Sequence, residues 1–157
     1  MMSRVQKGMV AGLAATVSVS VLELGNLAMG SPVMAFPAFI AEALGLEGNL
    51  MVGWMVHLAI GVLVLGSGFG FLYAKLPTTT AATRGIVYAV GAFTVLLVGI
   101  FMVGDPRIFS GSDGFGTVAW MLLTHAVFGI VLGSVYGTLM AREKRELRAM
   151  GGTAPAH

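Results

Sequence analysis

Four long apolar stretches dominate the sequence and limit what the chain can fold into. They run over residues 9–30, 51–74, 85–104 and 117–141. Each is long enough to cross a hydrocarbon core, which takes about 20 helical residues. Helices are expected because lipid offers no partners for exposed backbone groups, and the stretches lack the period-2 alternation of a barrel. The sequence therefore predicts an all-α protein: a polytopic four-helix transmembrane bundle that forms a single domain over residues 1–157.

Composition supports lipid as the main solvent of the side chains. Hydrophobic residues make up 57% of the chain and charged residues only 10%, against about 25% charged residues in an ordinary soluble domain. The chain has no cysteine, which excludes disulfides, thiolate metal sites and cysteine nucleophiles. No motif of a known catalytic mechanism is present, so the sequence gives no reason to expect an enzyme.

The basic residues indicate how the chain is oriented. Cytoplasmic connections of membrane proteins carry an excess of Lys and Arg. Eight of the nine basic residues lie before the first stretch, between the second and third, or after the fourth: Arg4, Lys7, Lys75, Arg84, Arg142, Lys144, Arg145 and Arg148. Only Arg107 lies in the other two connections. We therefore expect both termini in the cytoplasm. The alternative is a cleaved signal peptide, but the first stretch is longer than a signal core and contains Glu23.

The two halves of the chain resemble each other. Stretches one and three begin with a basic residue followed by glycine, at Lys7 and Arg84. Stretches two and four contain the similar segments Trp54–Gly61 and Trp120–Gly129, in which a glycine follows a histidine by four residues. The halves run in the same sense, so we predict two tandem hairpins related by a parallel repeat. The alternative is that unrelated membrane hairpins share aromatic and glycine placement by chance.

Three ionisable residues interrupt the apolar stretches: Glu23, His57 and His125. Small residues at intervals of three or four put each of them on a stripe expected to face the bundle interior. Helical rise places all three roughly 9–12 Å below the outer boundary of the membrane. We therefore expect them to form one buried cluster.

The cluster has several possible roles. The two histidines would suit a haem b, with Gly61 and Gly129 leaving room for the macrocycle. Glu23, His57 and His125 together are also a set that could hold a transition metal. In either case the protein would be an electron-transfer or sensing subunit. The alternatives are a purely structural hydrogen-bonded contact, a proton or small-solute path, and an accessory subunit of a larger membrane complex.

The remaining segments add three expectations. Pro37 suits a helix start, and we predict a short helix over residues 37–46 lying on the outer surface. The outer connection over residues 105–116 is rich in turn residues. The basic tail over residues 142–157 is expected to lie beside anionic lipid. Partners are the bilayer and, through the glycine-rich faces, other membrane subunits or a second copy of the chain; no nucleic acid is expected.

Three motifs that together cover nearly the whole chain resemble a known family. They are KGxVxG at Lys7–Gly12, WxxHxxxG at Trp54–Gly61, and HxxxGxxxGxxYG at His125–Gly137. In these the chain is similar to small bacterial four-span inner-membrane proteins that form a domain of unknown function. The resemblance implies a multi-pass protein of the bacterial inner membrane and carries no established activity.

Overall fold

The computed structural model describes residues 2–103 and 114–151. Arg107, most of the connection over residues 105–116 and the last six residues of the tail therefore lie outside the described residues. The described part is helical, with elements at the following positions: α1 Arg4–Ala28, α2 Phe36–Ala43, α3 Leu50–Ala59, the π-helix η1 Ile60–Gly66, α4 Ser67–Leu72, the 3₁₀ turn η2 Tyr73–Lys75, α5 Ala81–Val103 and α6 Gly114–Gly151.

The predicted all-α membrane bundle is confirmed. Four helical runs are long and apolar enough to cross a membrane, at residues 4–28, 50–75, 81–102 and 114–151. The second run consists of α3, η1, α4 and η2 in direct succession. Each run contains one of the predicted stretches almost completely, because an apolar sequence of this length can satisfy its backbone in lipid only as a helix.

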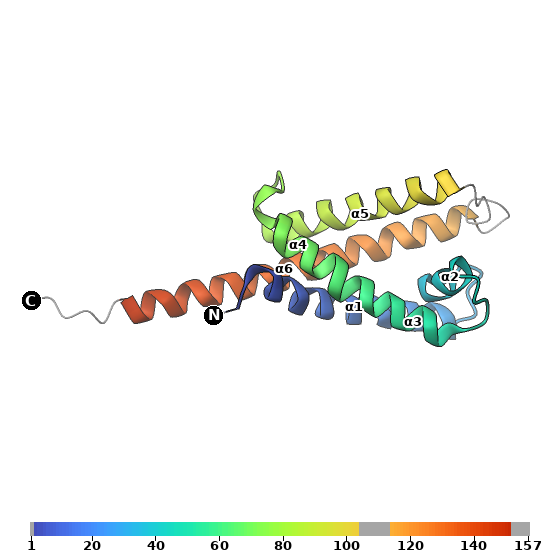
Figure 1. The fold of residues 1–157 in the computed structure, drawn as a ribbon, viewed down its shortest axis with the longest axis horizontal. Coiled ribbons are helices and arrows are strands. Elements are labelled where there is room, and N and C mark those ends of the chain that lie inside the picture. The colour runs from blue at the N-terminus through green and yellow to red at the C-terminus, as the bar shows by residue number, and fades with distance from the viewer. Residues whose placement is uncertain (1, 104–113, 152–157) are drawn as a thin grey trace, which may run out of the picture.

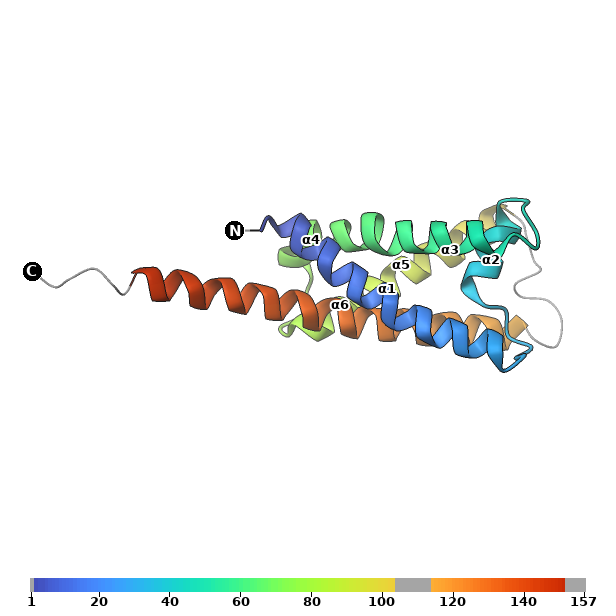
Figure 2. The same cartoon turned by 90° about the horizontal axis from the view of Figure 1, so that it is seen from below.

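The main backbone contacts link the second run to α1, α1 to α6 and α6 to α5, and the Phe69–Tyr88 and Tyr73–Arg84 contacts bring the second run against α5. The first hairpin is formed by α1 with the η1 and α4 parts of the second run, and the second hairpin by α5 with α6. Extensive contact between α1 and α6 joins the two hairpins. The N-terminus and the projecting end of α6 lie at one end of the bundle, and α2 lies at the other (Figures 1 and 2). We refer to these as the tail end and the α2 end.

Glycines set the spacing of the second hairpin. A methyl group on Gly85 of α5 would collide with the carbonyl oxygen of Gly129 on α6. A methyl group on Gly129 would lie 2.6 Å from the Gly85 oxygen and 2.7 Å from the Ile86 Cα. The two backbones are therefore in direct contact, as small residues permit in membrane helices.

The first hairpin uses glycines in the same way, together with the π-helix. Gly66 packs on Gly8 and Gly12 of α1, and Gly61 packs on Thr16. Residues five apart would point about 140° away from each other in an α-helix, but a π turn closes from residue i to i+5. The π segment thus turns both Gly61 and Gly66 toward α1. Within each hairpin, the two helices meet through glycine. That the two hairpins arose by duplication stays a prediction.

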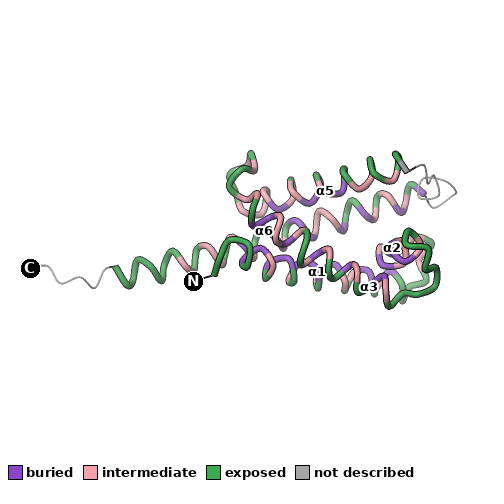
Figure 3. Tube along the Cα trace, viewed as in Figure 1, coloured by how far each residue is buried: buried purple, intermediate pink, exposed green. Residues whose placement is uncertain are grey.

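Buried segments face the inside of the bundle along its length (Figure 3), and the larger apolar core lies on the tail-end side of the cavity described below. It is built from three small or aliphatic residues of α1, one alanine of α5, and larger aromatic or leucine side chains of α4 and α6: Ala11, Ala15, Val19, Ala89, Phe69, Phe128, Leu132 and Tyr136. The four small or aliphatic members on α1 and α5 allow the aromatic rings to reach the middle of the bundle. This core separates the two ends of the molecule.

The last part of α6 continues beyond the bundle (Figures 1 and 2). Residues 144–151 are all exposed. At the base of this extension Lys7 of α1 forms an ion pair with Glu143, and the Lys7 side chain is only 6% exposed. The pair fixes the start of α1 against α6.

The glycine contacts predict unequal effects of the same substitution at two positions of α5. Gly85→Ala puts a methyl group into the backbone of α6, whereas a methyl group on Gly99 meets nothing within 4 Å. Gly85→Ala should lower the free energy of unfolding by about 1–3 kcal/mol, the usual range for overpacking. Gly99→Ala should be neutral or slightly stabilising because alanine favours helix. Unfolding in mixed detergent micelles measures both, and equal effects would contradict the packing described here.

Candidate functional site

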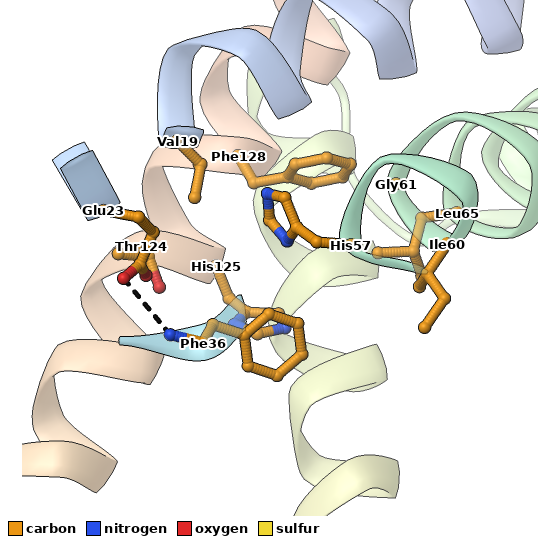
Figure 4. A pocket seen from close by; sticks show the side chains of 10 residues that line it. All are labelled: Val19, Glu23, Phe36, His57, Ile60, Gly61, Leu65, Thr124, His125 and Phe128. Atoms are coloured by element: carbon orange, nitrogen blue, oxygen red, sulfur yellow. Dashed lines mark hydrogen bonds between the residues drawn. The ribbon is translucent and has the colours of Figure 1, made fainter. Parts of the chain in front are cut away.

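The structure brings Glu23, His57 and His125 together around one cavity near the α2 end. The cavity has a volume of about 30 Å³, which is enough for about two water molecules. Glu23 comes from α1, His57 from α3 and His125 from α6 (Figure 4). The rest of the lining is Val19, Phe36, Ile60, Gly61, Leu65, Thr124 and Phe128. We refer to Glu23, His57 and His125 as the polar cluster.

Glu23 is fully buried and receives two hydrogen bonds from distant parts of the chain. Trp120 Nε1 on α6 donates to Oε1 over 3.2 Å. The backbone N–H of Phe36, at the start of α2, donates to Oε2 over 3.2 Å (Figure 4). A carboxyl group in a dry interior needs such donors because burial removes its water. The two donors also tie α1 to α2 and to α6.

His57 is 7% exposed and its Nε2 has no hydrogen-bond partner. The ring points from α3 into the space beside Phe128 (Figure 4). Trp54 and Phe36 pack against it edge-on, with ring centroids at 5.7 and 5.8 Å. A buried polar atom without a partner is uncommon in folded proteins and asks for an explanation. Here the unpartnered nitrogen belongs to a residue that lines the cavity.

His125 is held by its own helix. Its Nδ1 lies 2.7 Å from the carbonyl oxygen of Met121, one turn earlier. A carbonyl only accepts, so Nδ1 carries the proton and the neutral ring has a free lone pair on Nε2. The Phe93 ring of α5 lies 5.0 Å from the imidazole. The bond to Met121 therefore fixes both the tautomer and the direction of the ring.

Phe36 contacts both histidines. Its ring centroid lies 5.8 Å from that of His57 and 5.9 Å from that of His125, edge-on in both cases. Phe36 also packs with Phe39 against the small core of Phe93 and Met121. The short helix predicted on the outer surface is therefore in contact with the interior, and it spans residues 36–43. Its burial arises because Gly53 of α3 lets the Pro37 backbone approach directly.

Sequence patterns did not identify Phe36 and Trp120 as parts of the site. Trp120 entered the sequence analysis only as the counterpart of Trp54 in the internal repeat. A signal was available for Trp120, since an indole N–H needs an acceptor when buried and Glu23 is an unpaired acceptor predicted at a similar depth. No comparable signal marks Phe36.

The predicted cofactor sets find little support in this arrangement. Among residues 2–103 and 114–151, no group of three or more His, Cys, Asp or Glu side chains could hold a metal ion. The cavity is far too small for a macrocycle, and Phe36 contacts both imidazoles that would ligate a haem. Gly61 packs on Thr16, and Gly129 packs on α5. Both glycines therefore serve helix contact instead of making room for a haem.

The predicted glycine faces are also largely occupied within the chain. Gly129 and Gly133 pack on α5, and Gly137 packs on Ala81. In contrast, Gly91 and Gly99 of α5 have open space around them. The stripes that were expected to dock other subunits thus hold the bundle itself together.

Comparison with known proteins gives one match. No curated protein and no solved structure matches the chain. Residues 2–147 match a family whose description is "Family of unknown function (DUF6789)". The match includes all four apolar helices and the whole polar cluster. The chain therefore belongs to this family.

Proposed function

We propose that the polar cluster is a proton-binding site and that the protein is a proton-responsive membrane sensor or regulatory subunit. The observation that carries this proposal is the meeting of three ionisable side chains from three helices at one small cavity. Ionisable residues inside a membrane are costly and commonly belong to proton relays or functional sites. A purely structural contact would be expected to pair the histidines with Glu23, yet Glu23 is bonded to an indole and a backbone amide.

The chemistry of the cluster suits reversible protonation. A neutral imidazole accepts a proton on its unprotonated ring nitrogen, and a carboxylate accepts a proton in place of a donated hydrogen bond. His57 Nε2 is unpartnered, and one nitrogen of His125 remains as an acceptor. One or two water molecules in the cavity would link these acceptors to Glu23. A proton that entered the cavity would thus have three alternative acceptors.

The apolar core supports sensing over conduction. Val19 and Phe128 line the tail-end side of the cavity, and both belong to the core that fills that half of the bundle. Below them lie Phe69 and Leu132, which are fully buried. A proton path needs polar groups or water at close intervals, and this apolar layer interrupts it. This supports proton exchange between the cluster and the α2 end.

The same proposal includes the location of the protein in a bacterial cytoplasmic membrane with both termini in the cytoplasm. The N-terminus, the turn between α4 and α5 and the basic extension of α6 are all at the tail end (Figure 1). Lys75 ends η2 in that turn, and Arg84 lies in the first turn of α5. An excess of basic residues favours the cytoplasmic side. In that orientation the cluster would respond to acidity outside the cell.

The two tryptophans of the chain provide a direct test, since Trp54 contacts His57 and Trp120 contacts Glu23. In a Trp120→Phe variant, Trp54 is the only tryptophan. We expect its fluorescence in nanodiscs to change with a single-proton transition on acidification, because an imidazolium beside an indole quenches its emission. The matched control is the same variant carrying His57→Gln. If both proteins follow the same pH curve, His57 does not bind the proton.

Infrared difference spectroscopy tests the carboxyl group. Acidification of the wild-type protein should produce a protonated-carboxyl band that Glu23→Gln lacks, because Glu23 is fully buried and absorbs apart from solvated carboxyls. Glu47 is exposed, so Glu47→Gln should remove only signal from the solvated carboxyls. Spectra of wild type and Glu23→Gln that agree within error would show that Glu23 does not titrate.

A further inference from the structure

We propose that residues 31–43 form a hinged cap over the cavity and that the negative charge of Glu23 holds this cap closed. The proposal rests on the proposed function, because it says how protonation of the polar cluster would be converted into movement. We refer to residues 31–43, which include α2, as the cap segment. Its removal would take Phe36 away from the two imidazoles and open the cluster to the α2 end.

Three side chains of α1 and α6 form hydrogen bonds with the backbone of the cap segment. Asn26 Nδ2 on α1 donates to the carbonyl oxygen of Val33 over 3.0 Å. Thr117 Oγ1 on α6 accepts from the Met34 N–H over 3.3 Å. Glu23 Oε2 accepts from the Phe36 N–H over 3.2 Å. Glu23 supplies the one bond of the three whose strength depends on ionisation, since a charged acceptor makes a hydrogen bond about twice as strong as a neutral one.

Both ends of the cap segment have the backbone expected of hinges. Gly30 precedes it with φ +59°, and Gly45 and Gly48 follow it with φ +69° and +81°. Glycine adopts this left-handed region without steric cost. A methyl group at any of the three would meet nothing within 4 Å, and residues 27–30 and 43–50 are exposed. The joints are therefore free of packing, while Ala35, Pro37, Ile40 and Ala41 between them are buried.

Among the groups that line the cavity, the charge of Glu23 controls the strength of its hydrogen bond to the cap segment. Of the helices around the cavity, α3 contributes His57 and α6 contributes His125 as titratable groups. The lining residues from α2 and η1 are Phe36, Ile60, Gly61 and Leu65, which carry no charge. Neutralising Glu23 therefore weakens its bond to the Phe36 N–H, and no other acidic residue lines the cavity to take its place.

Hydrogen exchange at constant pH tests the cap directly. We expect the peptide that covers residues 31–36 to exchange roughly tenfold faster in Glu23→Gln than in wild type, given the difference between charged and neutral hydrogen bonds. Glu47→Gln, a charge removal at an exposed site outside the segment, is the control and should match wild type. Equal exchange in Glu23→Gln and wild type would overturn the proposal.

A second variant opens the cap without changing any charge. A methyl group on Gly53 would collide with the carbonyl oxygen of Pro37, so Gly53→Ala should displace α2 and speed exchange of the same peptide. Gly99→Ala is the control because nothing lies within 4 Å of it. Glu23→Gln added to Gly53→Ala should then have little further effect. A full tenfold additional increase would show that Glu23 does not act through the cap.

A disulfide separates failure of the cap from failure of the proposed function. The chain has no cysteine, and a Cβ at position 116 would lie 3.4 Å from Val33 Cγ2, so a Val33→Cys, Gly116→Cys pair would bring the two new side chains into contact. Oxidation should suppress the pH response of Trp54 fluorescence, and reduction should restore it. A response that persists unchanged in the oxidised protein would refute the cap and leave proton binding intact. The measurement is made in the Trp120→Phe background, and no response there, either in the reduced protein or without the two cysteines, would refute proton binding itself.

Discussion

Direct contact between helix backbones is the constraint on which the rest of this structure depends. Lipid tails are as apolar as leucine, so burial of apolar side chains alone does not drive membrane helices together. The glycines of α1, η1, α5 and α6 replace that force with close packing over a large area. The π segment between Ile60 and Gly66 exists for the same reason, because it aligns two glycines on the face that meets α1. The arrangement of the polar cluster follows from these contacts.

Features set by local periodicity could be predicted from the sequence. The four spans follow from the length of the apolar stretches. The stripe of Gly53, His57 and Gly61 is buried as expected because residues four apart share one face of a helix. Each member of the polar cluster was placed at one depth by counting residues from the end of its span. Helical rise is constant, so that count was enough to predict that Glu23, His57 and His125 meet.

Features that depend on a partner distant in the sequence could not be predicted in this way. α2 is buried against α3 because Gly53 has no side chain to keep the Pro37 backbone away. No periodicity within α2 indicates this contact. The sequence could not assign Gly61 and Gly129 to one role, because a small residue permits either a ligand or a helix at close range. The contact of Phe36 with both histidines bears on this choice, and it arises only when three helices have already packed.

Glu23 has an effect on the fold that its size does not suggest. Its two donors lie 13 and 97 residues away in the sequence, on α2 and on α6. In water, a lost donor would be replaced by solvent at little cost. Inside the bundle no such replacement is at hand, so each donor left without its acceptor would destabilise the arrangement by about 1–3 kcal/mol. Protonation of Glu23 therefore changes the stability of the packing of α1 against both α2 and α6. A buried carboxyl group can couple protonation to helix packing in this way, because it has two states of different charge. An apolar contact at the same place has only one state and cannot.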